Sequence, residues 1–218
     1  MARHIHIIGA GLAGLAAAIR LTKSQAHVVV HEATAFPGGR CRSYFDRAIG
    51  MPIDNGNHLV LSGNGAVQEY LRTIGSEGRL IGPDHADFAF ADVQTSERWQ
   101  VRINDGRFPW WIFSPSRRVP GTKARDYLAL ARLMWGGDVP IAEEVIADGQ
   151  LWTHLLEPVL VSALNTAPAE ASARLAAAVI RETMGKGGRT TRPRIAHPTL
   201  GDRKSTRLNS SHTDISRM

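Results

Sequence analysis

Residues 4–21 read HIHIIGAGLAGLAAAIRL, and this stretch decides the fold. It opens with a short β-branched run that predicts a buried strand, and residues 12–23 show the apolar periodicity of a helix. Gly9, Gly11 and Gly14 lie between and within these elements with G-x-G-x-x-G spacing. This motif indicates dinucleotide binding where it follows a strand and opens a helix, as it does here.

Each glycine has a separate physical task in such a turn. Gly9 permits the tight turn, Gly11 lets the backbone approach a pyrophosphate, and Gly14 lets the helix pack closely on the strand. The pyrophosphate would then lie on free N–H groups at the positive end of the helix dipole. We therefore predict that a dinucleotide binds to one continuous run of residues: Gly9, Ala10, Gly11, Leu12, Ala13 and Gly14.

A second strand is predicted at residues 28–31, and it ends at Glu32. A carboxylate there should accept hydrogen bonds from an adenosine ribose, with Ala33 beside it, and it disfavours a 2′-phosphate. The alternative is a glycine-rich turn followed by a strand-end glutamate with no ligand. The order of strand, glycines, helix, strand and acid favours the dinucleotide, but it does not separate NAD from FAD.

The next segment, HEATAFPGGRCRSY at residues 31–44, contains Gly38, Gly39 and Arg40. It resembles the second fingerprint of the flavin amine oxidase and phytoene desaturase superfamily. The resemblance implies an FAD cofactor whose diphosphate lies against this turn. Glycine backbone suits close approach and a guanidinium suits phosphate. The alternative is that Arg40 only caps a surface turn.

Residues 54–64 read DNGNHLVLSGN and carry a more specific resemblance. Together with ALNT at 163–166 and AEASA at 169–173, they resemble the squalene-associated FAD-dependent branch, the hydroxysqualene dehydroxylase family. The resemblance covers residues 4–201 and implies that the isoalloxazine end of FAD passes a segment formed by Asn55, Gly56, Asn57 and His58. Members of that family are longer, so we expect this chain to be C-terminally truncated.

The family implies reductive removal of a hydroxyl group from hydroxysqualene, giving squalene for hopanoid or other isoprenoid biosynthesis in bacteria. The cofactor would carry the chemistry, and the expected partner is a long isoprenoid substrate. His58 is a candidate proton donor, although a histidine that only holds its loop is the favoured alternative. Two alternatives for the function stay open: a flavin desaturase or amine oxidase with another substrate, and an inactive nucleotide-binding fragment.

The fold class expected from these patterns is α/β. We predict a Rossmann-like FAD-binding βαβ domain over residues 1–82 and a partial, mostly helical α+β substrate domain over residues 83–201. Residues 202–218 are polar and lack apolar periodicity, so we expect a disordered tail that is extraneous to the natural sequence. Further elements are predicted at 43–46, 51–54, 65–74, 88–92, 99–103, 127–135, 151–164 and 169–184.

Composition and charge narrow the remaining classes of function and location. The net charge of +6 is spread along the chain, and no basic stripe with interleaved aromatics indicates nucleic-acid binding. The single cysteine, Cys41, excludes an intrachain disulfide and favours a cytoplasmic protein. The sequence shows no cluster of cysteine and histidine residues, so it does not predict a metal site. Peripheral contact at the inner membrane face stays open, and so does the oligomeric state.

Aromatic residues gather at Phe108, Trp110, Trp111 and Phe113. They could line a tunnel for a long isoprenoid, because such a tunnel needs apolar walls. They could equally form core between strands and helices. The sequence leaves these two interpretations open.

Overall fold

The computed structural model describes residues 3–24, 26–56, 59–200 and, for the backbone only, 213–217. These residues form two compact units. Unit 1 contains residues up to 60, 64–81 and those from 194 onward, and unit 2 contains 61–63 and 82–193. Compared with the predicted ranges, residues 61–63 and 82 therefore belong with the second unit and residues from 194 with the first.

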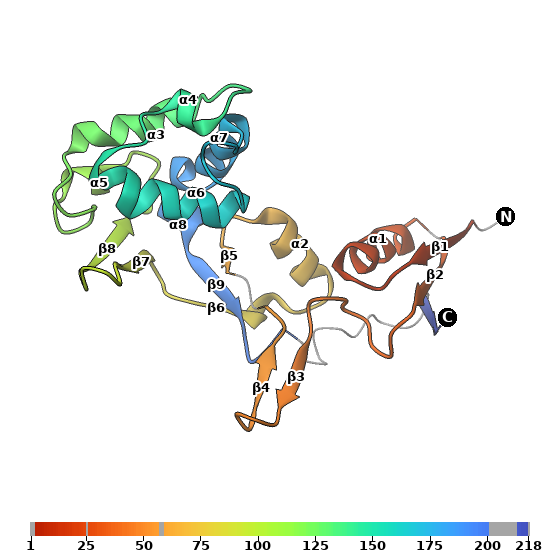
Figure 1. Ribbon diagram of the computed structural model, residues 1–218. Coiled ribbons are helices and arrows are strands. Elements are labelled where there is room, and N and C mark those ends of the chain that lie inside the picture. Colours follow the sequence, from red (N-terminus) through yellow and green to blue (C-terminus); the bar gives the residue numbers. More distant parts are fainter. Residues whose placement is uncertain (1–2, 25, 57–58, 201–212, 218) are drawn as a thin grey trace. The chain divides into compact units, whose positions relative to one another are not determined.

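A βαβ element opens unit 1 at the start of the chain (Figure 1). Strand β1 (His4–Ile8) is parallel to β2 (His27–Glu32), with Ile5 opposite Val28 and Ile7 opposite Val30. Helix α1 (Leu12–Thr22) connects them. One small cluster of buried residues holds strands and helix together: Ala10, Leu15, Ala18, Ala26, Val28 and Val30.

A third strand, β10 (Thr213–Arg217), extends this sheet by pairing in parallel with β2. The expectation that residues 202–218 form a disordered tail is therefore not met at these five positions. The physical reason is that the edge of β2 offers unsatisfied backbone donors and acceptors, and almost any extended segment can pair with them. The other residues of that tail lie outside the described part of the chain.

The rest of unit 1 is assembled from short elements. Strands β3 (Ser43–Asp46) and β4 (Met51–Asp54) form an antiparallel hairpin. Helix α2 (Gly65–Thr73) begins at Asn64, whose side chain accepts a hydrogen bond from the Val67 amide. A 3₁₀ turn, η1 (Glu77–Arg79), leads into β6 (Leu80–Ile81). Strand β6 pairs antiparallel with β9 (Pro193–Ala196). With β5 (Val60–Leu61) these strands form a sheet of order β5–β9–β6.

Unit 2 begins with an antiparallel hairpin of β7 (Ala86–Ala91) and β8 (Arg98–Ile103). The remainder of the unit is helical, as predicted, but it consists of shorter pieces. In chain order these are η2 (Trp110–Phe113), η3 (Ala124–Tyr127), α3 (Leu128–Leu133), α4 (Ile141–Glu144), α5 (Gly149–Leu151), the π-helical turn η4 (Trp152–Leu156), α6 (Glu157–Leu164), α7 (Ala173–Glu182), η5 (Met184–Lys186) and α8 (Gly188–Thr191).

The predicted helix at 151–164 shows how proline reshapes a helical run. Pro158 lies in the first turn of α6, and the preceding residues form a π turn in which the Glu157 amide donates to the Trp152 carbonyl. Because proline has no N–H for the preceding turn, the regular hydrogen-bond ladder cannot continue through it. The predicted start of α7 near Pro168 is also wrong, since Ser172 caps that helix.

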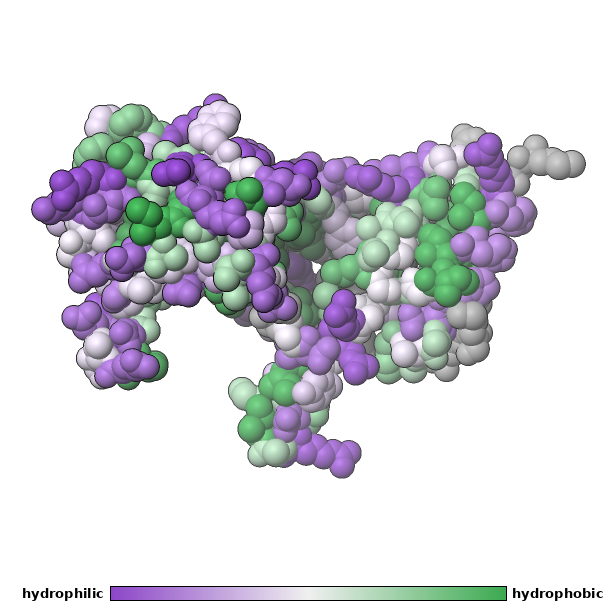
Figure 2. Space-filling view, turned by 45° about the horizontal axis from the view of Figure 1, so that its top comes forward, coloured by the Kyte–Doolittle hydropathy of each residue, from purple (hydrophilic) through white to green (hydrophobic). Residues whose placement is uncertain are grey.

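A large apolar core occupies unit 2, and its fully buried side chains include Trp111, Leu133, Ile141 and Leu155. The viewed face of the molecule nevertheless shows green hydrophobic residues among purple hydrophilic ones (Figure 2). Among the described residues, no helix is long and apolar enough to cross a bilayer.

Candidate dinucleotide site

The glycine turn after β1 has the geometry that the motif requires. Gly9 has a φ of +96°, a region that favours glycine, and its amide donates a 2.7 Å hydrogen bond to the His31 carbonyl at the end of β2. This bond ties the turn to the neighbouring strand. The first turn of α1 holds no acidic side chain, and Gly11 supplies no side-chain cap. The positive end of the helix is thus left open to an anion.

Gly11 and Gly14 differ in what a side chain would meet. A Cβ built on Gly14 would lie 1.9 Å from the Gly9 carbonyl oxygen, so Gly14 is needed for the close packing of helix on strand. A Cβ on Gly11 would meet nothing within 4 Å. Gly11 therefore borders open space. A pyrophosphate that contacts the backbone of this turn would occupy that space.

Glu32 lies at the end of β2, and its carboxylate is held by the surrounding chain. One oxygen accepts from the Ala10 amide at 2.8 Å, and the other accepts from the amide and hydroxyl of Thr34, each at 2.8 Å. The hydrogen bonds from Thr34 and then from Ala10 lower the pKa of Glu32, so the group is ionised at neutral pH. A carboxylate has about four acceptor positions, which leaves capacity for hydroxyl donors. Ala33, between these residues, is exposed.

The turn at Gly38 and Gly39 lies directly against the first glycine turn. The Gly38 amide donates to the Ala10 carbonyl at 2.8 Å, and Gly11 and Gly38 form a parallel bridge. Both Gly38 and Gly39 have positive φ, and a Cβ on Gly39 would lie 3.2 Å from the Gly11 Cα. The two glycine segments, which are far apart in the sequence, thus form one surface.

A cavity of about 570 Å³ lies between the end of β2 and the loop that carries the second glycine segment, and the residues of the first glycine turn do not line it. Glu32 and Arg40 both line it, together with Asn55, whose side chain donates to the Arg40 carbonyl at 3.1 Å. Gly56 follows with a φ of 73° and donates to the Asp54 carbonyl. Asn57 and His58 lie outside the described residues, so their predicted roles stay predictions.

Two kinds of cavity residue were missed by the sequence reasoning. Thr34 orients the Glu32 carboxylate through two hydrogen bonds, and its position two residues after the acid is a turn pattern that could have been noticed. The other residues are brought in by the path of the loop and carry no local signal: Phe36, Cys41, Arg42 and Ser43. Arg42 is of special interest because it adds a second guanidinium to the cavity beside Arg40.

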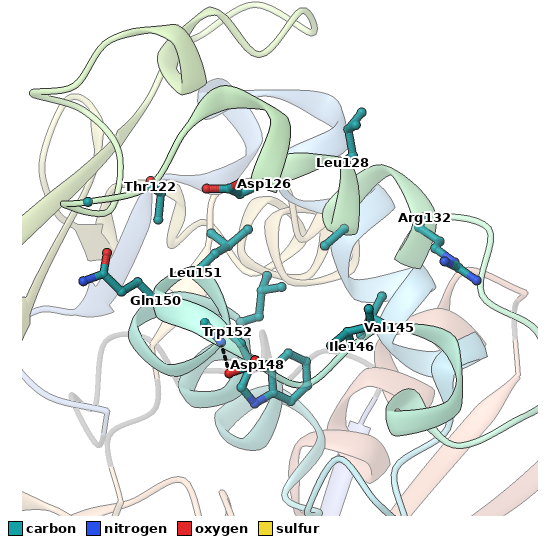
Figure 3. A pocket seen from close by; sticks show the side chains of 14 residues that line it. Thr122, Asp126, Leu128, Arg132, Val145, Ile146, Asp148, Gln150, Leu151 and Trp152 are labelled. Atoms are coloured by element: carbon teal, nitrogen blue, oxygen red, sulfur yellow. Dashed lines mark hydrogen bonds between the residues drawn. The ribbon is translucent and has the colours of Figure 1, made fainter.

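Unit 2 holds a separate cavity of about 520 Å³ (Figure 3). Its apolar lining includes Leu128, Ile146 and Leu151, while Asp148 is engaged by a 2.6 Å hydrogen bond from the Gly149 amide. The aromatic segment at 108–113 does not line this cavity. Trp111 is buried in the core, and Phe108, Trp110 and Phe113 are exposed.

The residues of unit 1 fit the adenosine diphosphate part of FAD. The space beside Gly11 is open, the terminus of α1 is uncapped, and an ionised carboxylate borders a cavity. Among the described residues, no group of three or more histidine, cysteine, aspartate or glutamate side chains could hold a metal ion.

Comparison with known proteins agrees with this geometry. The hydroxysqualene dehydroxylase of Sinorhizobium fredii is 49% identical over 201 residues, which cover 92% of this chain and 48% of that protein. The zeta-carotene desaturase of Solanum lycopersicum is 33% identical over 81 residues, or 37% of this chain and 14% of that protein. The crystal structure of an oxidoreductase from Methanosarcina mazei matches with a TM-score of 0.66 at 17% identity, covering 98% of this chain and 51% of the other.

The chain thus spans about half the length of the curated dehydroxylase that it matches. The likeness to the solved structure confirms the predicted α/β fold. The sequence model of the family described as flavin containing amine oxidoreductase matches residues 12–216, which is most of the chain. A flavin is the cofactor of these proteins, as the resemblance of the segment at Gly38, Gly39 and Arg40 implied. The chain belongs to the flavin containing amine oxidoreductase family.

Proposed function

We propose that this chain is the FAD-binding part of a hydroxysqualene dehydroxylase, which replaces the hydroxyl group of hydroxysqualene by hydrogen to give squalene. The observation that carries the proposal is the 49% identity to such an enzyme over 92% of the chain. By contrast, the likeness to the carotene desaturase covers 37% of the chain. Identity that extends through both units supports a shared substrate class as well as a shared cofactor.

Each residue of the dinucleotide site has a proposed task. Gly9, Ala10, Gly11, Leu12, Ala13 and Gly14 receive the pyrophosphate at the amide groups of the turn and the start of α1. Glu32 and the adjacent Ala33 backbone receive the ribose. Gly38 and Gly39 let the chain approach the diphosphate, and Arg40 neutralises its charge. Asn55 and Gly56 hold the loop that leads toward the flavin ring.

The bound flavin in its reduced state supplies the two electrons and the hydrogen that replace the hydroxyl group. The remaining requirement is a proton for the departing hydroxyl. His58 stays a candidate for that proton donor, and Asn57 stays a predicted neighbour of the flavin. The favoured alternative for His58 is still a structural role in its loop.

The substrate assignment is tested with a protein of the relatives' full length that contains this sequence. Anaerobic incubation with hydroxysqualene and reduced FAD should yield squalene. The matched reactions contain phytoene or a primary amine in place of hydroxysqualene. Turnover of either of these without any squalene formation would favour a desaturase or an amine oxidase instead.

A second candidate is an inactive nucleotide-binding fragment, and the half-length coverage of the relative favours it for the isolated chain. FAD titration and an activity assay are run on the 218-residue chain and on the full-length protein. FAD binding without turnover by the chain, beside turnover by the full-length protein, would support an inactive fragment of an active enzyme. Turnover by the chain itself would exclude the inactive fragment. In the full-length protein, Gly11→Asp should abolish flavin retention, because it places an anion where the pyrophosphate would lie. A Gly11→Asp protein that stays fully yellow would remove this motif from the site.

A further inference from the structure

Three exposed aromatic side chains in unit 2 form a continuous surface. We define the aromatic triad as Phe108, Trp110 and Phe113, which are 54%, 66% and 55% exposed. Their ring centroids lie 4.4 Å apart for Phe108–Trp110, 6.2 Å for Trp110–Phe113 and 6.3 Å for Phe108–Phe113. Contiguous exposed apolar surface of this kind marks an interaction site more often than a scattered residue does.

The triad is presented by a firmly held loop. The Asn104 side chain donates to the carbonyls of Gly106 and Phe108 at 3.1 and 2.9 Å and accepts from the Trp111 amide at 3.1 Å. Trp111 is only 2% exposed and packs edge-on against Tyr127 at 5.0 Å. Because the backbone is anchored on the core side, the three rings are held outward at little further entropic cost.

The sequence that carries the triad is strongly cationic. Residues 106–125 contain no aspartate or glutamate and five cationic residues, Arg107, Arg117, Arg118, Lys123 and Arg125. The two acids that flank this range are already paired, Asp105 with Arg192 at 2.9 Å and Asp126 with Arg125 at 3.8 Å. Arg107 and Arg117 are exposed. The surface therefore combines apolar rings with positive charge.

We infer that the aromatic triad and its arginines bind the surface of an anionic phospholipid bilayer. Tryptophan is favoured at the boundary between headgroups and acyl chains, phenylalanine enters the acyl region beside it, and nearby lysine and arginine residues are attracted to anionic headgroups. Phenylalanine has no polar group, so transfer of its ring from water into hydrocarbon is favourable. This inference rests on the surface alone, and it would also bring the protein to the phase in which the proposed substrate dissolves.

The test is flotation of the 218-residue chain with vesicles of phosphatidylcholine alone or mixed in equal parts with phosphatidylglycerol. The chain should float with the mixed vesicles and lose that binding as salt is raised. Replacing Phe108, Trp110 and Phe113 together by serine should lower the partition coefficient by about tenfold or more. Arg107→Gln and Arg117→Gln should each lower it by about fivefold.

Trp135→Ser is the matched control, because Trp135 is 83% exposed but lies outside the triad. It should leave flotation unchanged, and circular dichroism should show that every variant keeps its helical content. Equal loss of binding in the Trp135 control, or no flotation of the unaltered chain, would overturn the inference.

A concentration-dependent dimer that dissociates on triad substitution, without vesicle binding, would also overturn it, because a second copy would then cover the rings. None of these measurements requires flavin or substrate. If squalene is formed by the full-length protein in detergent while flotation fails, the inference fails and the proposed function stands.

Discussion

Unit 1 carries the nucleotide motif but little core, whereas unit 2 carries a large core and none of the residues of that motif. Among the described residues, six buried side chains form the cluster of unit 1 and nineteen form that of unit 2. Unit 1 also exposes large side chains such as Ile8, Phe36 and Phe45 at 72%, 71% and 62%. The site thus depends on backbone geometry in a unit that buries little apolar surface.

The difference teaches that a binding motif and a stable core are separate properties. In unit 1 the contacts that matter are local hydrogen bonds, such as those from Gly9 to His31 and from Ala10 to Glu32. In unit 2 they are apolar contacts between distant elements, such as α3 with α7. Substitutions of core residues in unit 2 should therefore change stability, whereas substitutions at the open, ligand-facing positions of unit 1 should change ligand binding first.

The largest expected effect is that of Trp111→Ala in unit 2. Removing this buried ring should cost about 4 kcal/mol of unfolding free energy, measured by urea denaturation and by amide hydrogen exchange in unit 2. The control is the adjacent Trp110→Ala, which should cost about 0.5 kcal/mol or less because Trp110 is 66% exposed. Equal losses for the two variants would break the distinction between core and surface on this segment.

Gly14→Ala should cost about 3 kcal/mol in unit 1, since its Cβ would fall 1.9 Å from the backbone oxygen of Gly9. Gly11→Ala is the control: its Cβ would meet nothing within 4 Å, and its φ of −71° suits alanine. Gly11→Ala should keep the unfolding free energy within about 0.5 kcal/mol but weaken FAD binding by titration. A Gly14→Ala protein as stable as the original would show that α1 does not pack as described.

Glu32→Ala should weaken FAD binding by about tenfold or more in the full-length protein, because charge-assisted hydrogen bonds to the ribose disappear. Glu77→Ala is the control in the same unit, since Glu77 pairs with Arg72 on the surface. Unchanged affinity in Glu32→Ala would remove Glu32 from the site.

The pH dependence of FAD binding gives a second test of Glu32. Hydrogen bonds from Thr34 and Ala10 lower the pKa of Glu32 below its ordinary value of 4.5, so the charged form is the stabilised one. The contribution of this carboxylate to FAD binding should be present at neutral pH and be lost only as pH falls below that ordinary value. The measurement is FAD affinity of the original chain and of Glu32→Ala across that range.

The smallest expected effect is that of Arg40→Gln, about a fivefold loss of FAD affinity by titration. Arg42 also lines the cavity and can supply part of the same positive charge. The control is Arg47→Gln, on the exposed turn of the β3–β4 hairpin, which should not alter FAD binding. Unchanged affinity in the Arg40→Gln variant would favour the alternative that Arg40 only caps its turn.

Sequence reasoning located the regular local structure well. The bounds of β1, β3 and β4 agree with the predicted ranges, and α1, β2 and α2 differ only at their ends. These elements are encoded by short-range signals such as the Asn64 cap and strand alternation. The glycine turn and Glu32 were likewise identified, because their spacing is local.

The remainder depends on contacts that no short window contains. Strand β9 pairs with β6 across more than a hundred residues, as in Leu80 opposite Ala196, and it was missed. The cavity residues Phe36 and Arg42 are placed by the fold of their loop around the site. Trp110 and Trp111 could not be told apart either, because a 3₁₀ turn directs neighbouring side chains differently and only tertiary packing decides which one is buried.

The distribution of tryptophan has an optical consequence. All five tryptophans of the chain, Trp99, Trp110, Trp111, Trp135 and Trp152, belong to unit 2, and unit 1 has none. Tryptophan emission, excited at a wavelength where Tyr44 and Tyr70 of unit 1 absorb little, therefore reports on unit 2, whereas the visible absorbance of a bound flavin would report on unit 1. The two halves of the molecule can thus be followed at separate wavelengths in one cuvette without any added label.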